Sequence, residues 1–264
     1  MDATFRVVPT CFPRGQLLNL MIEYQGHVLP VAHFIMSGRT EGLYIAAMQA
    51  FKEKVLDINP LHAMADFETA IKNALILVFP NIDVRGCRFH FGQAVMKKLK
   101  SVGLQTDYLN TPAVKKWGKK YVALCTLPER YIPDELTKLQ NETAAYPNIF
   151  TKKKMQNFEK YFVQYWMVKK TPSCFSTFGL TRRTNNAVES LHSQMQRSIS
   201  THRSLWRFLE ELVQHVIGPT ETMVHAIDAG NNPREPTRKK RMLRAQRQMD
   251  MESKLTNQEW TPTK

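Results

Sequence analysis

The chain has 264 residues, an apolar content of 43% and a net charge of +14, from 37 Lys and Arg against 23 Asp and Glu. This composition excludes global disorder, and no apolar run approaches the roughly 18–20 residues that a membrane helix needs, so we expect no membrane partner. The four cysteines are widely scattered, which is typical of a reducing compartment rather than of a disulfide framework.

The first third of the chain alternates extended and helical patterns. Gln25-Gly26 lies between two apolar runs and predicts the turn of a hairpin. Two helical patterns then alternate with two further extended runs, which predicts a mixed sheet with helices packed on it. The predicted strands cover 3–9, 16–24, 27–36, 61–65 and 82–89, and the predicted helices cover 41–58 and 67–78.

After Phe91 the strand patterns stop and helical patterns follow one another. Thr184 is a candidate N-cap for one late helix, and Gly218-Pro219 is expected to end the next. The sequence therefore predicts a large helical segment and then two more helices. These predicted helices cover 93–100, 112–125, 133–145, 152–168, 184–197 and 204–217.

The positive charge is concentrated in the middle of the chain. Residues 92–183 hold 17 Lys and Arg against 6 Asp and Glu, a net charge of +11, whereas residues 1–91 are balanced at 8 against 8. Such a segment attracts the phosphates of nucleic acid without regard to base sequence, although it could also simply keep a helical domain soluble. The lysine pairs include Lys115, Lys116, Lys119 and Lys120.

The end of the chain is basic and punctuated by proline, which predicts a partly flexible tail over residues 218–264. Within it, residues 238–241 read Arg-Lys-Lys-Arg and resemble a nuclear import signal. Such runs also occur in plain solvated tails. We expect a nuclear protein.

Three acidic residues lie in, or directly next to, predicted strands and helices. Asp66 follows the strand at 61–65, Asp2 lies in the first extended run, and Glu189 lies on a late helix. Taken singly, each has an ordinary structural interpretation, such as an N-cap for Asp66. Together they match the ribonuclease H-like arrangement, in which acids converge on two divalent ions, Mg²⁺ or Mn²⁺, about 3.5–4 Å apart.

Cys87 and His90 have the spacing of half a zinc site. Two further ligands, such as Cys125 with His192 or His202, would be needed, and no second paired motif is present. The alternative is that Cys87 is a small buried residue at a strand end, while His90 points toward the acids and touches phosphate or substrate.

These blocks resemble the catalytic domain of Mutator-like element (MULE) transposases, a DDE-type family, of the kind associated with FLYWCH-type zinc-finger proteins. DATFRVVP is similar to the block with the first catalytic Asp, ADFETAIKNALILVFP to the block with the second, and GCRFHF to the Cys-x-x-His motif. RRTNNAVESLH carries the Glu. The likeness runs in order to about residue 217.

The resemblance implies a domain organisation and a chemistry. An RNase H-like mixed sheet flanked by helices would be formed by residues 1–91 and 181–217, with a basic all-α insertion at 92–180 and the tail at 218–264. Metal-dependent cleavage of DNA and strand transfer would be the activity, and homo-oligomers are an expected assembly. By resemblance, the metals would be held by Asp2, Asp66 and Glu189, with His90 assisting and Arg182 and Arg183 contacting phosphate.

The chain departs from the family pattern at its start, where only Met1 precedes Asp2 and Ala3 replaces the usual Gly. We therefore expect the upstream half of the central strand to be missing, and catalysis by this fragment to be weak. The alternative hypothesis is a non-catalytic nucleic-acid-binding or protein-interaction module descended from a transposase.

Overall fold

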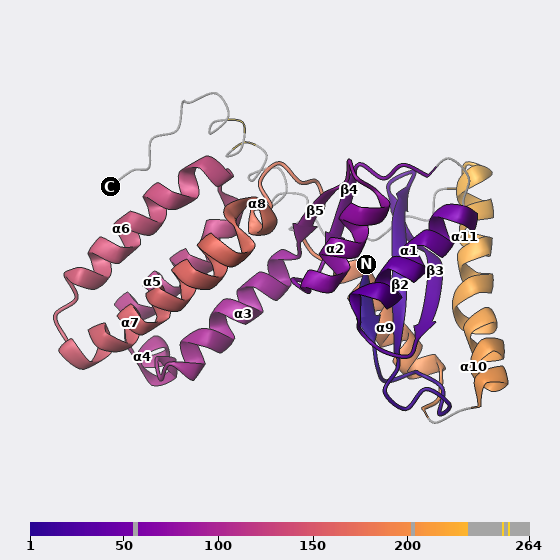
Figure 1. The fold of residues 1–264 in the computed structure, drawn as a ribbon, viewed down its shortest axis with the longest axis horizontal. Coiled ribbons are helices and arrows are strands. Elements are labelled where there is room, and N and C mark those ends of the chain that lie inside the picture. The colour runs from indigo at the N-terminus through magenta and orange to yellow at the C-terminus, as the bar shows by residue number, and fades with distance from the viewer. Residues whose placement is uncertain (55–57, 202–203, 232–249, 251–252, 254–264) are drawn as a thin grey trace.

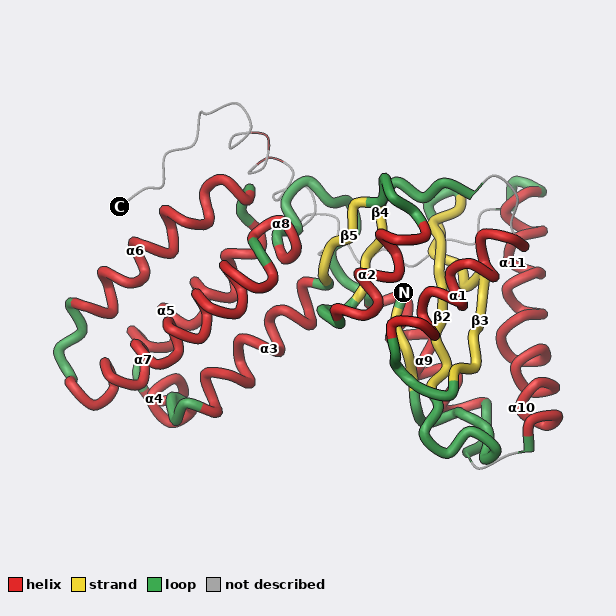
Figure 2. The backbone as a smooth tube through the Cα atoms, viewed as in Figure 1, coloured by secondary structure: helices red, strands yellow, loops and turns green. Residues whose placement is uncertain are grey.

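The computed structural model has two parts, a mixed α/β unit and an elongated block of helices (Figure 1). The α/β unit combines the first strands and helices of the chain with its late helices, and the helical block comes from the middle of the chain. Helix α3 (Arg88–Ser101) leads from the last strand into the helical block (Figure 2). The structure describes residues 1–54, 58–201, 204–231, 250 and 253.

Among the described residues, five strands form two small sheets. Three of them pair antiparallel in the order β1-β2-β3, and the other two pair in parallel. The mixed α/β prediction is confirmed at this level. The strands are β1 (Asp2–Thr4), β2 (Gln16–Tyr24), β3 (His27–Met36), β4 (His62–Ala65) and β5 (Asp83–Gly86).

The predicted hairpin of β2 and β3 is confirmed. Its turn places Gln25 and Gly26 at φ values of 47° and 84°, and two positive φ values match the right-handed twist of the flanking strands. Leu17 and Leu18 are both fully buried although they point to opposite faces of β2. Both faces of this sheet are therefore covered.

Helices cover the two faces from opposite sides. On one face, Leu18 packs in a core with α1 (Glu41–Lys54) and α2 (Thr69–Val78), which lie in front of the sheet in Figure 1. On the other face, Leu17 packs in a core with α9 (Asn186–Ser198) and α10 (Leu205–Leu212). A region more than 160 residues away in sequence thus completes the sandwich around the N-terminal hairpin.

The two sheets meet at the first residue of the chain. The Met1 amino group donates a hydrogen bond of 2.8 Å to the Met64 carbonyl of β4, while the next residues of β1 pair with β2. From the other side, the Asn185 amide donates to the Met1 carbonyl at 3.2 Å. Met1 therefore lies between β2 and β4.

The helical block has an aromatic core of its own. Trp166 contacts Phe67, Phe91 and Phe175, with ring centroids 4.7–5.8 Å apart. Because Phe67 follows β4 in the α/β unit, this core joins the two parts. The block contains α3, α4 (Gln105–Asn110), α5 (Pro112–Ala123), α6 (Ile132–Ala144), α7 (Ile149–Phe162), a π-helix (Val163–Lys170), α8 (Pro172–Phe175) and two 3₁₀ turns (Leu124–Thr126, Glu129–Tyr131).

The prediction of a strand over residues 82–89 is wrong in its second half. β5 ends at Gly86, and α3 starts at Arg88, so Cys87 precedes a helix and His90 lies in its first turn. The helix starts early because Phe91, Val95 and Leu99 recur every four residues and all enter the aromatic core of the block. The Cys-x-x-His pair is therefore a helix N-terminal feature, not a strand end.

Two late helix boundaries also differ from the predictions. Thr184 is not an N-cap, since α9 begins at Asn186 after Asn185. Gly218-Pro219 does not end a helix, because α10 runs on through a π-helical turn (Val213–Ile217) into α11 (Gly218–Asp228). A proline ring collides with the carbonyl four residues earlier in a regular α-helix, and the wider π-turn before Pro219 relieves that collision.

The expected basic tail, including the nuclear-import-like run at 238–241, lies mostly outside the described residues, as does His202. The part of the tail that is described begins with the helix α11. In the described part of the chain, no helix has the length and apolarity that a membrane span requires.

Candidate active site

The first two predicted acids lie at the ends of neighbouring strands. Asp2 is in β1, and Asp66 follows β4 directly. Because Met1 bonds to Met64, the two strands run side by side at this point. Asp2 and Asp66 thus lie in adjoining segments of the α/β unit.

The loop that carries Asp66 is held from both sides. The Asp66 carboxylate accepts a hydrogen bond of 3.0 Å from the Glu68 backbone N–H. Asp66 thus bonds to the backbone just before α2, as an N-cap does, although it is not the capping residue itself. The buried Lys170 ammonium reaches in from the helical block and donates to the Phe67 carbonyl at 2.6 Å and to the Thr69 hydroxyl at 3.0 Å. The end of the π-helix therefore fixes the backbone next to Asp66.

A glycine makes room for this arrangement. A Cβ on Gly86 would lie 2.1 Å from the Phe67 ring, far inside any allowed contact. The ring can therefore pass over β5 and pack edge-on against Trp166, which anchors the residue next to Asp66 in the aromatic core.

His90 and Glu189 face each other across the site. Glu189 lies in the first turn of α9, and its carboxylate is 4.0 Å from the His90 imidazole. The neighbouring Cys87 thiol, and then the negative charges of Asp2 and Asp66, raise the pKa of His90 to about 9, against the opposing effect of burial. At neutral pH His90 is therefore an imidazolium among carboxylates.

Cys87 is the partner of that imidazolium. Burial alone would raise the pKa of its thiol, but His90 and the Asn185 backbone N–H, which lies 3.3 Å from the sulfur, lower it. Cys87 is fully buried, as the alternative interpretation of this residue predicts. The pair thus links the start of α3 to the start of α9.

A buried polar network lies behind Asp2. Asn19 of β2 stands opposite Asp2 in the strand register and is fully buried. Its carboxamide contacts His33 Nδ1 at 2.6 Å and His192 Nε2 at 3.0 Å. His33 donates to the Asn19 oxygen and the Asn19 nitrogen donates to His192, so His192 is neutral here, and burial lowers the pKa of both imidazoles.

This network predicts a pH dependence of stability. Burial lowers the pKa of His33 from 6.5 to about 4, so the unfolded chain binds the proton more tightly than the folded one. Stability is then complete above about pH 6.5 and is lost as pH falls toward 4. We expect His33 to account for about 2 kcal/mol of the loss between pH 7.5 and pH 4.5 in urea unfolding.

The matched variant is His33→Gln, which keeps a polar group but cannot titrate. We expect it to be less stable at pH 7.5 and to lose less stability on acidification. An equal loss in the variant and the native chain would show that His33 is not the titrating group.

The three acids are of the type that binds Mg²⁺ or Mn²⁺, but their side chains do not form a metal site in the structure. Carboxylate oxygens are the ligands that Mg²⁺ and Mn²⁺ prefer. Yet among the described residues no three His, Cys, Asp or Glu side chains are close enough to hold an ion together. Instead, Asp2 and Asp66 each accept a local backbone N–H, from Ala3 at 2.8 Å and from Glu68 at 3.0 Å.

The cations predicted to contact phosphate differ in their surroundings. Arg182 is exposed but bonds to the Glu23 carboxylate at 2.9 Å and to the Gly26 carbonyl at 2.8 Å, and Arg183 donates to the Leu180 carbonyl at 3.0 Å. On α5, Lys115, Lys116 and Lys119 are exposed. The α5 lysine Lys120 forms an ion pair with Glu142.

Sequence reasoning missed the positioning residues Asn19 and Lys170 around these acids. Asn19 leaves a signal, since it is the one polar residue within the apolar run LLNLMI. His192, which the sequence suggests only as a zinc ligand, lies three residues after Glu189 and so on the same side of α9. Lys170 leaves none, because its contact depends on how the helical block folds back on β4.

The fold and site together define a mixed α/β protein with acids at a strand edge, joined to a basic helical block. Residues 1–94 match the family model of the MULE transposase domain. This matched segment contains Asp2, Asp66, Cys87 and His90, whereas Glu189 lies beyond it. No curated protein matches the chain. The match points to a transposase-derived function for the α/β unit.

Proposed function

We propose that the chain is a DDE-type, transposase-derived domain that cuts and joins DNA phosphodiesters in the nucleus, of the kind found with FLYWCH-type zinc fingers. The observation that carries the proposal is the position of Asp2 in β1 and of Asp66 directly after β4, with the Glu189 carboxylate 4.0 Å from the His90 imidazole. The match to the MULE transposase domain supports it over the segment that holds both aspartates.

The proposal assigns Mg²⁺ or Mn²⁺ to the three carboxylates. Bound there, two such ions would supply activation of the attacking oxygen and stabilisation of the leaving 3′ oxygen. The residues of this chain have further roles. His90 is placed to meet a phosphate oxygen with its positive charge, while Lys170 and the Asn19 network hold the backbone beside the two aspartates.

A second candidate function is non-catalytic DNA binding. Two observations favour it. The Asp2 and Asp66 carboxylates accept backbone N–H groups, and no three possible metal ligands lie close together among the described residues. The basic surface of the helical block would then bind DNA, and the acids of the α/β unit would catalyse no reaction.

Incubation with a labelled duplex in Mg²⁺ or Mn²⁺ tests the two against each other. We expect nicked or joined product that requires the divalent ion and disappears with a chelator. Product that persists in the chelator would overturn the metal-dependent reaction. Tight binding without product in either ion, at any ratio of protein to DNA, would establish the non-catalytic alternative.

DNA binding is expected to depend strongly on salt and little on base sequence. The segment 92–183, at net +11, supplies phosphate contacts, and each contact releases about 0.9 counterion from duplex DNA. Charge reversal by Lys115→Glu with Lys116→Glu should weaken binding and reduce the slope of log affinity against log salt by about 2. Fluorescence anisotropy at several salt concentrations measures both quantities.

The control is a double reversal of two exposed cations outside that segment, Arg14→Glu with Lys54→Glu. It makes the same change in net charge but removes no lysine of α5. If both doubles reduce the slope equally, net charge alone governs binding and α5 is not the contact surface.

A further inference from the structure

The first turn of helix α3 is bonded to two elements of the candidate site, β4 and the loop that leads into α9. The Cys87 backbone N–H donates at 3.0 Å to the carbonyl of Ala65, the last residue of β4. The next N–H, that of Arg88, donates at 2.9 Å to the Arg183 carbonyl in the loop before α9. The backbone of the following residue, Phe89, is therefore held beside the candidate active site.

Phe89 carries an exposed aromatic ring at this place. Its surface is 43% exposed, whereas Cys87 and Phe91, two residues away on each side, are fully buried. Among the described residues its one ring contact is with His90, at 5.9 Å between centroids and a tilt of 53°. The His90 imidazole is in turn 4.0 Å from the Glu189 carboxylate. A ring that no core uses thus lies in solvent next to the residue that faces Glu189.

The ring begins a basic stripe along α3. Gln93 and Lys97 are exposed and follow Phe89 at intervals of four residues, which places the three side chains on one side of the helix. Lys100 is exposed one turn further on, and α3 contains no Asp or Glu. Among the described residues neither lysine has an acidic partner. Because α3 runs from β5 out along the helical block (Figure 1), the stripe leads away from the candidate site.

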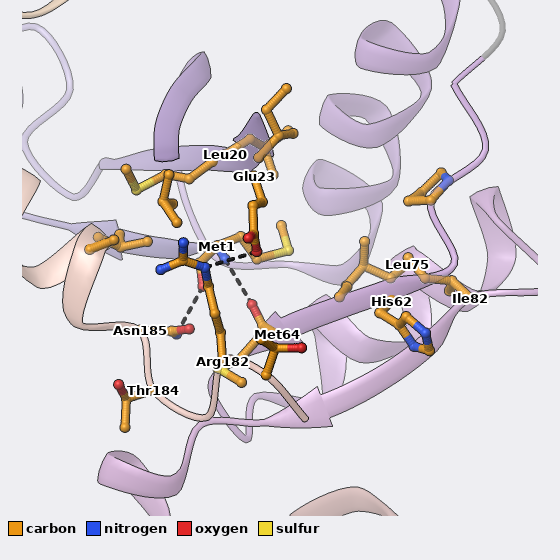
Figure 3. Close-up of a pocket in the computed structure, with 18 of the residues that line it drawn as sticks. Met1, Leu20, Glu23, His62, Met64, Leu75, Ile82, Arg182, Thr184 and Asn185 are labelled. Atoms are coloured by element: carbon orange, nitrogen blue, oxygen red, sulfur yellow. Dashed lines mark hydrogen bonds and ion pairs between the residues drawn. The ribbon is translucent and has the colours of Figure 1, made fainter. Parts of the chain in front are cut away.

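The polar side chains of the loop before α9 are engaged within the α/β unit instead. Figure 3 shows Arg182 bonded to Glu23 and Asn185 bonded to Met1, at 2.9 Å and 3.2 Å. A ligand would have to break these bonds before it could use either side chain. The stripe on α3 requires no such rearrangement.

An aromatic ring and a row of cations bind different parts of a nucleotide strand. Lysines attract the phosphates of any DNA, paired or unpaired. A ring stacks on the face of a base, and that face is open only where the base has left the duplex stack. An exposed phenylalanine at the start of a basic stripe therefore suits a strand that is locally unpaired.

We propose that Phe89 stacks on an unpaired base beside the candidate active site, and that Lys97 and Lys100 contact phosphates of the same strand further along α3. This inference rests on the proposed DNA function and adds that the substrate is locally unpaired at the site. A fully paired duplex would meet the lysines but not the ring.

The test compares two labelled DNAs without divalent ions, so that cleavage does not enter. One is a full duplex, and the other is the same duplex with a short unpaired run of thymines in one strand. We expect Phe89→Leu to weaken binding of the unpaired DNA by the full chain about tenfold and to leave duplex binding unchanged. Phe89→Trp, which keeps a ring, should retain the preference.

Phe150→Leu is the matched control. Phe150 is 79% exposed and is the second residue of α7, as Phe89 is the second residue of α3. It lies away from the acids, so its loss should change neither affinity. Lys97→Gln should weaken binding of both DNAs equally and reduce the slope of log affinity against log salt by about 1.

Photocrosslinking locates the contact directly. With 5-iodouracil in place of one unpaired thymine, irradiation should join the base to Phe89, and mass spectrometry of the peptides identifies the residue. A crosslink elsewhere, equal affinities of the native chain for both DNAs, or equal losses in Phe89→Leu and Phe150→Leu would overturn this inference and leave the proposed function intact. Failure to bind either DNA would overturn both.

Discussion

Replacing Asp66 with alanine is expected to remove the response of this protein to divalent ions. An ion that binds only the folded state at 100 times its dissociation constant adds about 2.7 kcal/mol of stability. For a domain of this size, that raises the unfolding midpoint by roughly 5–10 °C. We expect Mn²⁺ to produce such a rise in the native chain and not in Asp66→Ala or Glu189→Ala.

The same two variants should lower ion-dependent DNA cleavage more than about 100-fold, because even groups that only support metal ligands contribute 10- to 100-fold. Asp134→Ala is the matched control, since Asp134 is an exposed acid in the first turn of α6 in the helical block. It should leave both the Mn²⁺ response and the cleavage unchanged.

Each result has a contrary outcome. If the Mn²⁺ response survives in Asp66→Ala, the ion binds elsewhere and the assignment of the strand-edge acids is wrong. If Mn²⁺ stabilises the native chain but no DNA is cleaved, the acids bind metal in a module that has no strand-transfer activity.

The second large effect is expected in the aromatic core. Trp166 is fully buried and contacts Phe67, Phe91 and Phe175. Trp166→Ala removes the ring at the centre of this cluster and should cost about 3–5 kcal/mol of unfolding free energy. That loss corresponds to a fall of about 10 °C in the unfolding midpoint.

Trp206 provides a control of the same residue type, because 76% of its surface is exposed. Trp206→Ala should change stability by less than about 0.5 kcal/mol. Trp166→Phe should cost less than Trp166→Ala, since it keeps a ring, and no acceptor for the buried indole N–H is found among the described residues. Similar costs for Trp166→Ala and Trp206→Ala would contradict the assigned core.

A functional consequence follows from the position of Phe67. Its ring packs on Trp166, and its carbonyl accepts a hydrogen bond from the Lys170 ammonium, so the helical block helps to hold the residue next to Asp66. Loss of the Trp166 ring should therefore also weaken the Mn²⁺ response. Lys170→Met, which keeps the length of the side chain, should do the same with a smaller loss of stability.

Local patterns were sufficient for much of the α/β unit. Two apolar runs around Gln25-Gly26 determined the hairpin, because a two-residue turn with positive φ values fixes the register of its strands. The order of strands and helices assigned Asp2 to the first strand and Asp66 to the end of the fourth, because the position of an acid along a strand is a local property of the sequence. Apolar spacing likewise predicted most helices of the middle segment.

Other features were decided only by tertiary packing. α3 begins at Arg88 rather than after a longer strand, because Phe91 is drawn into a core made by residues up to 84 positions later. The helical path of α10 continues into α11 and past Pro219, because the π-helical turn at Val213–Ile217 makes room for a proline that by itself predicts a helix end. Local propensity is a difference of about 1 kcal/mol or less per ordinary residue, and burial of one aromatic side chain exceeds it.

The candidate site also has features that the sequence predicts and features that only the tertiary structure decides. Its carboxylates could be read from the sequence, since their types and positions are local properties. The contacts that hold them could not, because Lys170 reaches Phe67 across 103 residues and Asn19 reaches His192 across 173.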